Sequence, residues 1–276
     1  MQPPPEPPDR AAETGTNGGR EAVQRWRLVL RREALPSDLA QRDLLTGWES
    51  TLAESGLPIA GLDMPKPKAR FAIAAPLASG IAGEAELADL WLVERTPRWR
   101  VREALSGRLP TAHALVDLYD VWLGEPALPG RVAASVYRAS LPGPVNTPRL
   151  AGAAEALLTA ETLPRERRKG DGTVSYDLRL FLVSIDVAPA PGGGAVLRLT
   201  LRHAPARGVG RPDEALAALG QALGDPPLQP VSLVREALVL ADPPPPAPPA
   251  PRGPRRQPAP RSGLDQRSPP PRAGAR

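Results

Sequence analysis

The expected fold follows from residues 55–93, which read SGLPIAGLDMPKPKARFAIAAPLASGIAGEAELADLWLV. Gly56 and Pro58 predict the end of a preceding helix, because glycine favours the position just after a helix and proline does not continue one. Residues 59–70 then form a loop that holds two of the chain's three lysines. Residues 84–93 alternate between two faces, which indicates a strand.

The neighbouring segments complete a unit of strands and helices. The first half is predicted to hold strands at 23–32, 71–76, 84–93 and 113–123, with helices from Ser37 or Asp38 up to Gly56 and from Pro97 to about Leu105. The second half is predicted to hold strands at 131–140, 174–187, 195–202 and 231–240, with helices at 148–160 and 213–223. Both halves follow the order β-α-β-β-α-β of the ferredoxin-like unit.

The sequence therefore predicts an α+β fold of two tandem ferredoxin-like βαββαβ units with antiparallel sheets. The first unit is expected at residues 23–125 and the second at residues 130–241. The flanking segments, 1–22 and 242–276, are rich in proline and poor in large apolar residues. Segments of this composition do not bury enough apolar surface to become ordered, so both termini are expected to be disordered.

Composition excludes several kinds of site and partner. The chain has no cysteine, which rules out disulfides, thiolate metal sites, iron–sulfur clusters and cysteine nucleophiles. No apolar run approaches the roughly 20 residues that cross a bilayer, and no secretory signal is visible, so a cytoplasmic chain without membrane contact is expected. The net charge of +5 comes from the tail, whose seven arginines face one aspartate, and the rest of the chain sums to about −1.

Two basic clusters are candidate phosphate contacts. The first lies in the loop at 59–70 and consists of Lys66, Lys68 and Arg70. The second is also predicted as a loop and consists of Arg165, Arg167, Arg168 and Lys169. Both side-chain types bind phosphate oxygens, although charge runs in loops are commonly just solvated. If the two loops share a face, they form one basic groove, and Arg179 and Arg211 would line it.

Motifs in the first half resemble those of the radical SAM-associated (radical SAM-linked) proteins, a family of unknown function. The end of that family's first helix is matched by Gly56, Leu57 and Pro58. Its loop motif is matched, with one residue inserted, by Gly61, Pro65, Pro67 and Lys68. Its turn and third strand are matched by Gly80, Glu86 and Asp89.

The resemblance continues into the second half and covers residues 24–240. The family's basic loop and Asp-X-Arg strand are matched by Lys169, Asp177 and Arg179. Its Arg-Pro-Asp helix start is matched by Arg211, Pro212 and Asp213. The chain departs from the family at two histidines: only Asp43 remains of a Ser-His-Leu-Asp motif, and Lys66 stands where the loop histidine is expected. Any chemistry that those histidines perform is lost here.

The resemblance also implies a partner. Members of this family are often fused to, or encoded beside, a radical SAM enzyme, so a radical SAM protein is the expected partner. A chain without cysteine does not carry that enzyme's cluster, so we expect a stand-alone form with no cofactor. In layout the chain also resembles, at the level of fold alone, the RAMP-type CRISPR repeat-processing RNA endonucleases.

The remaining candidate residues have mostly structural interpretations. His113 and His203, the two histidines, fall in different halves with no second ligand in register, so neither a metal site nor catalysis is expected. Asp43 has no histidine near it in the motif, which favours a salt bridge over a general base. The five tryptophans are mostly expected in the core, although Trp99, between two arginines, suits stacking on a base.

Three functions are compatible with these features. The favoured one is a non-catalytic accessory module that works with a radical SAM partner and binds the phosphates of a structured RNA through the two basic loops. The second is a protein-interaction subunit that docks a radical SAM enzyme without RNA contact. The third, an RNA-processing or RNA-modifying enzyme of RAMP-like fold, is disfavoured because no nucleophile with a base and an orienting group is readable.

Overall fold

The computed structural model describes residues 19–35, 41–170, 172–204 and 207–242, without the side chains of residues 41–43 and 169. The predicted helix start at Ser37 or Asp38 lies outside these residues, as does nearly all of the two termini that were predicted to be disordered. Within the described ranges, no helix is long and apolar enough to cross a membrane.

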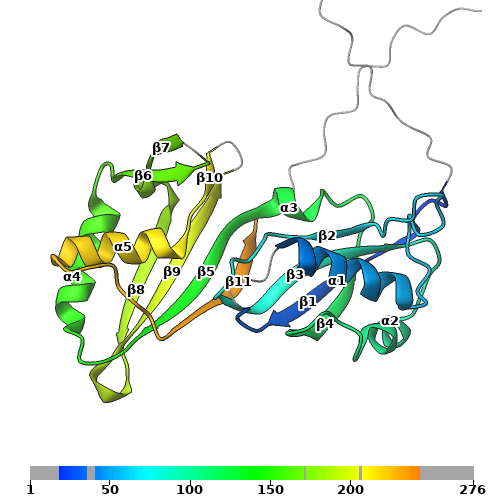
Figure 1. The fold of residues 1–276 in the computed structure, drawn as a ribbon, viewed down its shortest axis with the longest axis horizontal. Helices are drawn as coiled ribbons and strands as arrows, with labels where there is room; N and C mark the ends of the chain where they lie inside the picture. Colours follow the sequence, from blue (N-terminus) through cyan, green and yellow to red (C-terminus); the bar gives the residue numbers. More distant parts are fainter. Residues whose placement is uncertain (1–18, 36–40, 171, 205–206, 243–276) are drawn as a thin grey trace, which may run out of the picture. The chain divides into compact units, whose positions relative to one another are not determined.

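The first half is a small sheet with two helices packed against it (Figure 1). Its elements are β1 (Gln24–Arg32), α1 (Gln41–Glu54), β2 (Phe71–Ile73), β3 (Ala82–Leu92), α2 (Arg98–Leu105) and β4 (His113–Val121). β3 pairs with both β1 and β2, and β1 also pairs with β4, all antiparallel. Trp48 and Leu52 of α1 and Leu105 of α2 share one buried core with Leu28 and Leu90 of the strands.

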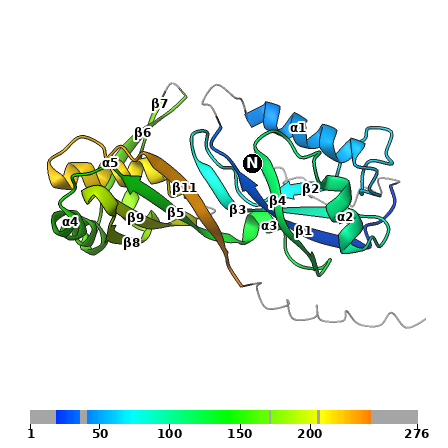
Figure 2. The same cartoon turned by 90° about the horizontal axis from the view of Figure 1, so that it is seen from below.

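The second half repeats this order and adds a hairpin. Its elements are α3 (Leu128–Arg131), β5 (Val132–Leu141), α4 (Thr147–Thr159), β6 (Pro164–Lys169), β7 (Gly172–Asp177), the 3₁₀ helix η1 (Leu178–Phe181), β8 (Leu182–Pro189), the 3₁₀ turn η2 (Pro191–Gly193), β9 (Ala195–Ala204), β10 (Gly208–Val209), α5 (Pro212–Leu223) and β11 (Ser232–Leu240). β5 pairs with β11 and β9, and β9 pairs with β8, all antiparallel. Figure 2 shows α4 and α5 beside these strands, where Leu150, Leu157 and Leu219 join the second core.

One parallel pairing joins the two halves. Residues 234–235 of β11 lie opposite residues 82–83 of β3. In the described part of the chain, nine strands therefore belong to one sheet, with β11 between β5 and β3. Arg235, which is buried, forms an ion pair with Glu86 and donates to two backbone oxygens of residues 75–76, at 2.9 and 3.2 Å. A buried ion pair thus lies at the junction of the halves.

The predicted α+β class with a mostly antiparallel sheet is confirmed. The finer description as two tandem ferredoxin-like units stays a prediction, and the two halves share one continuous sheet instead of having separate ones. Most helices and strands lie within a few residues of their predicted bounds, and β2 ends early, at Ile73.

The predicted strand at 174–187 is wrong. The stretch is divided among β7, η1 and β8, and the expected basic loop before it is strand β6. The division has a local cause at Asp177, whose Oδ1 accepts from the backbone N–H groups of Leu163 (2.8 Å) and Arg179 (2.9 Å). The carboxylate thus closes the base of the hairpin and caps η1.

Candidate nucleic-acid interface

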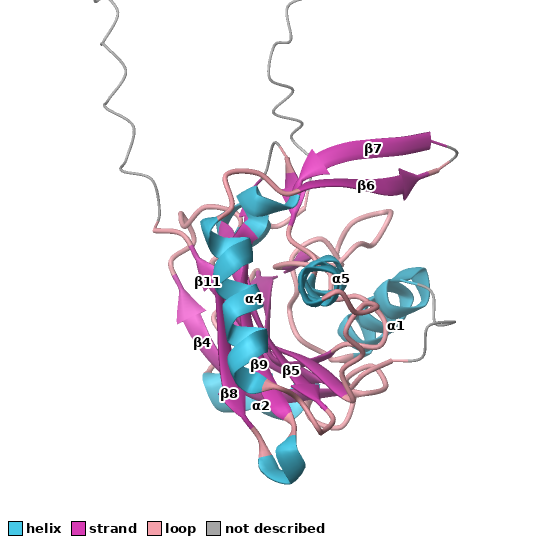
Figure 3. Ribbon diagram, turned by 90° about the vertical axis from the view of Figure 1, so that its left-hand side faces the viewer, coloured by secondary structure: helices cyan, strands magenta, loops and turns pink. Residues whose placement is uncertain are grey.

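The second basic cluster lies on a hairpin that is separate from the main sheet. β6 and β7 pair only with each other in the described part of the chain, and we call this pair the basic hairpin. Figure 3 shows it extending outward past α5. The side chain of Lys169, at its tip, is outside the description.

Strand geometry sorts the hairpin's side chains into two faces. Residues directly opposite each other share a face, and Arg165 lies opposite Tyr176 while Arg167 lies opposite Val174. Both arginines are half-buried, and the Arg167 guanidinium lies 5.3 Å from the centre of the Tyr176 ring. Arg168 follows Arg167 along β6 and is exposed. One face of the hairpin is therefore basic with an aromatic ring at its base.

A groove of about 640 Å³ lies between the basic hairpin and α5. Its lining includes four arginines that the sequence predicted as phosphate contacts: Arg165, Arg167, Arg168 and Arg211. Arg211 lies far along the chain from the other three. Gln221 of α5 bridges the two sides, because its side-chain oxygen accepts from Arg165. Among the described residues, no carboxylate forms an ion pair with any of the three hairpin arginines.

The α5 side of the groove is acidic. Asp213 and Glu214 lie in the first turn of α5, and Asp225 follows its end. Asp213 forms an exposed ion pair with Arg211 at 3.3 Å. Burial, followed by the hydrogen bond and the charge of Glu214, raises the pKa of Tyr176 well above its ordinary value, so this phenol stays neutral. The groove therefore has one basic and one acidic side.

Arg179 does not line this groove. Its guanidinium donates to the backbone oxygen of Leu182 at 2.9 Å, within the η1 turn. The predicted residues Asp177 and Arg179 thus organise the base of the hairpin.

The first basic cluster lies elsewhere. Figure 1 shows the loop between α1 and β2 on the opposite side of the picture from β6 and β7. Lys66 and Lys68 are exposed in it, together with Pro65 and Pro67. Arg70 lies with its guanidinium 4.8 Å from the centre of the Trp91 ring. The expected single groove formed by both basic loops is therefore not formed.

Gly61 fixes the shape of the loop at residues 59–70, which we call the lysine loop. Its φ of +87° suits glycine, and a Cβ atom here would lie 2.3 Å from the backbone oxygen of Lys68. The backbone N–H of Lys68 donates to the oxygen of Gly61 at 3.0 Å, so the loop is closed by a contact that leaves no room for a side chain.

Two other residues of the family motif are buried in ion pairs. Glu86 binds Arg235, as described above. Asp89 accepts from Arg25 Nε at 2.9 Å and from Arg27 Nε at 2.8 Å, and all three side chains are buried. Burial opposes the charge of Arg27, but the hydrogen bond and the charge of Asp89 raise its pKa above the ordinary value. Along β1 these arginines alternate with Trp26 and Leu28, so they are buried on the opposite face of the sheet from that core.

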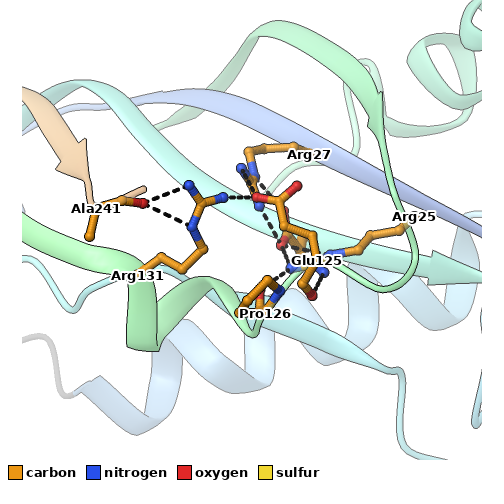
Figure 4. A network of polar contacts seen from close by, with 7 residues as sticks. Arg25, Arg27, Glu125, Pro126, Arg131 and Ala241 are labelled. Atoms are coloured by element: carbon orange, nitrogen blue, oxygen red, sulfur yellow. Dashed lines mark hydrogen bonds and ion pairs between the residues drawn. The ribbon is translucent and has the colours of Figure 1, made fainter. Parts of the chain in front are cut away.

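The reason is a segment that covers this face of the sheet (Figure 4). Arg25 also donates to the backbone oxygens of Glu125 (2.6 Å) and Pro126 (3.1 Å). The Glu125 carboxylate accepts from Arg27 at 3.2 Å and also binds Arg131. Each arginine is therefore held by an acceptor, and the network is structural. The side chain of Asp43, the remaining motif residue with a predicted salt-bridge role, is outside the description.

The histidines lie in different halves. His113 packs edge-on against Trp48 at 5.4 Å, and burial lowers its pKa. His203 Nε2 lies 2.8 Å from the hydroxyl of the buried Ser135. Burial first, and then the charge of Arg235, lower the pKa of His203 to about 4. A serine with no exposed surface does not meet a substrate, so this pair is no nucleophile and base.

Three of the five tryptophans are buried as expected, and two are not. Trp99 on α2 is 66% exposed and Trp122 after β4 is 76% exposed. Tyr119 of β4 and Leu123 are also exposed, and β4 is the last strand at its end of the sheet. An edge strand with exposed aromatic side chains is typical of a docking surface.

Comparison with protein families identifies the chain. Residues 25–211 match the model of the family described as "Uncharacterized protein conserved in bacteria (DUF2344)", and the chain belongs to this family. The expectation of a family of unknown function is confirmed at this level. A comparison with curated proteins gave no match.

Solved structures give weak similarity. A Cbf5-Nop10-Gar1 complex matches with a TM-score of 0.41 and 9% identity over 76% of this chain and 49% of that chain. An archaeal box H/ACA sRNP Nop10-Cbf5 complex matches with a TM-score of 0.37 and 10% identity over 76% and 48%. An unknown protein from Galdieria sulphuraria matches with a TM-score of 0.20 and 12% identity over 73% and 89%. The chain spans about half the length of the first two, and similarity at this level carries no argument about function.

Proposed function

We propose that this chain is a non-catalytic, RNA-associated module that binds RNA phosphates through the basic hairpin. The observation that carries the proposal is the groove beside α5, which gathers Arg165, Arg167 and Arg168 with the distant Arg211. The hairpin arginines have no carboxylate partner among the described residues. Their charge is therefore available to an anionic ligand, and arginine suits phosphate because its planar donors match the phosphate oxygens.

The lysine loop supplies a second and separate contact in this proposal. Lys66 and Lys68 are exposed, and Arg70 presents its guanidinium beside Trp91. Two contacts at different places suit a structured RNA that is long enough to reach both. The two halves, residues 23–125 and 130–241, would act as two ferredoxin-like units, each with one RNA contact.

The partner in this proposal is a radical SAM protein. It rests on the resemblance of the lysine loop, the turn and the third strand to the radical SAM-linked family. The module would hold RNA for that partner, and the partner would supply the reaction.

A direct test is fluorescence anisotropy with a labelled hairpin RNA, using the full chain and the Arg167→Gln/Arg168→Gln variant. We expect the affinity to fall about 10- to 100-fold at low salt, because two charge-assisted phosphate contacts are lost. The salt dependence should fall as well, by a slope of about 1.4 to 1.8. Arg95→Gln/Arg100→Gln, which removes two exposed arginines of the first half, is the matched control.

A second variant tests the lysine loop separately from the basic hairpin. Lys66→Gln/Lys68→Gln should weaken binding of a long structured RNA and leave a short RNA unaffected. If the hairpin variant binds RNA as tightly as the original chain, the proposed function is wrong.

A second candidate, a protein-docking subunit, is favoured by the exposed aromatic residues at the β4 edge. Trp99, Tyr119 and Trp122 would contact the radical SAM partner, with an added strand along β4. A pull-down after nuclease treatment tests it: the partner should stay bound to the original chain and be lost with Trp122→Ser. Loss of the partner on nuclease treatment alone would instead favour association through RNA.

A further inference from the structure

The charges of the groove beside α5 are separated by side. The β6 side carries Arg165, Arg167 and Arg168 with one carboxylate, Glu166. The α5 side carries three carboxylates with one arginine, Arg211. The groove is therefore close to neutral in total, and any preference for an anion comes from the β6 side alone. A ligand that carries negative charge along both of its edges would meet repulsion from α5.

This separation of charge favours single-stranded over double-stranded nucleic acid. A duplex presents phosphates of two strands, so a duplex in this groove places one backbone against the carboxylates. A single strand has phosphates along one edge and bases along the other. The amino groups of bases donate hydrogen bonds that carboxylates accept.

Resting on the proposed function, we infer that the groove takes single-stranded RNA, with its phosphates along β6 and its bases turned toward α5. The volume of about 640 Å³ lies within the range of ligand pockets and suits one or two nucleotides. Ala217, a small residue in the lining from the middle of α5, leaves room for a base.

Two further side chains fit this orientation. The Tyr176 ring lines the groove beside the Arg167 guanidinium, 5.3 Å from the ring centre, and offers a face for stacking. Gln221 accepts from Arg165 through its side-chain oxygen, which leaves its amide N–H groups to donate to a base or a sugar. Tyr176 comes from β7 and Gln221 from α5, so each side of the groove contributes one of them.

The acidic side also predicts a base preference. Cytosine presents an N4 amino donor where uracil presents an O4 acceptor, and a carboxylate accepts only from the donor. Asp225 is exposed, and Asp213 shares its charge with Arg211. Cytosine should therefore bind better than uracil.

The test uses the full chain and fluorescence anisotropy at low salt with three labelled RNAs: an oligocytidine and an oligouridine of about eight nucleotides, and a short duplex. We expect oligocytidine to bind about fivefold or more tightly than oligouridine, and about tenfold or more tightly than the duplex. The arginine-rich tail is common to all variants, so differences between variants report on the groove.

Asp213→Asn/Asp225→Asn is the diagnostic variant. It should remove the preference for oligocytidine and tighten duplex binding, because the repulsive side of the groove is neutralised. Asp186→Asn, an exposed aspartate on β8 outside the groove lining, is the matched control and should change neither.

The outcomes separate this inference from the proposed function. If the duplex binds as well as oligocytidine, and Arg167→Gln/Arg168→Gln weakens both, the inference is overturned and the proposed function stands. If that variant weakens neither RNA, the proposed function itself is wrong. If polyglutamate displaces oligocytidine at equal concentrations of charge, the groove binds acidic peptides and the inference is overturned.

Discussion

Arginines have opposite situations in the two halves of this chain. Arg25 and Arg27 of β1 are buried and share the carboxylate of Asp89, while Arg167 and Arg168 of β6 have no carboxylate partner among the described residues. In the sequence both pairs stand in strands that hold several arginines, QRWRLVLRR for β1 and PRERRK for β6. The comparison teaches that the partner of an arginine decides whether its charge stabilises the fold or is available to a ligand. The count of arginines in a segment does not decide this.

The largest expected effect on stability follows from removing the carboxylate that Arg25 and Arg27 share. Asp89→Asn leaves the buried Arg25 without a countercharge and Arg27 with Glu125 alone, which should lower the free energy of unfolding by about 3–5 kcal/mol. Urea unfolding followed by tryptophan fluorescence measures it. Asp117→Asn, which removes an exposed carboxylate bound to Arg98 and Arg102, should leave the midpoint unchanged. Equal stability of both variants would show that burial of Arg25 and Arg27 contributes little.

A smaller effect is expected at the junction of the halves. Glu86→Gln removes the charge that faces Arg235 but keeps a hydrogen-bond acceptor, so the expected loss is about 2–3 kcal/mol. Glu84→Gln is a matched control on the same strand, because Glu84 binds the partly exposed Arg138. A shift of the same size in both variants would contradict a special role for the buried pair.

A still smaller effect concerns pH. The pKa of His203 is lowered to about 4 by burial and by the charge of Arg235, so between pH 4 and about 6.5 the unfolded chain binds the extra proton. Stability should therefore fall as the pH falls through this range. Because the side chain is partly solvated, the total is on the order of 1 kcal/mol.

The test compares unfolding midpoints at pH 7 and pH 4.5. His203→Gln keeps an acceptor for Ser135 and should flatten the dependence. His113→Gln, whose parent histidine also has a lowered pKa, should flatten it separately. A dependence that survives both substitutions would point to carboxylates instead.

The smallest effect is expected on the stability of the hairpin variant. Arg167→Gln/Arg168→Gln should change the free energy of unfolding by less than about 1 kcal/mol, because neither side chain holds a carboxylate and only the contact of Arg167 with the Tyr176 ring is lost. The same variant is expected to lose RNA affinity, so stability and binding should separate here. A large loss of stability would contradict the contrast between the two pairs of arginines.

Local patterns predicted most of the fold. Alternation from Glu84 to Val93 gave the right strand, and Gly56 and Pro58 marked the end of α1. Asn146, just before the predicted helix at 148–160, caps α4 by accepting from the backbone N–H of Arg149 at 3.0 Å. Each of these features depends on residues within a few positions of each other, which is what a sequence displays.

The hairpin and the buried network depend on distant contacts. Residues 164–177 are polar on both faces, so their alternation carries no sign of burial and the strand pair was missed. Asp89 lies more than 60 positions from Arg25 and Arg27, and only the pairing of β1 with β3 brings them together. The groove likewise forms only because Gln221 and Arg211 lie against β6, and no local sequence pattern predicts that contact.

The position of β11 has a consequence for biosynthesis. This strand lies between β5 and β3, yet residues 232–240 leave the ribosome after every other described strand has been made. Until then, the neighbouring edges of β3 and β5 lack their partner and Glu86 lacks Arg235. A nascent chain therefore contains two incomplete sheets, and they become one sheet only when the last strand pairs with both.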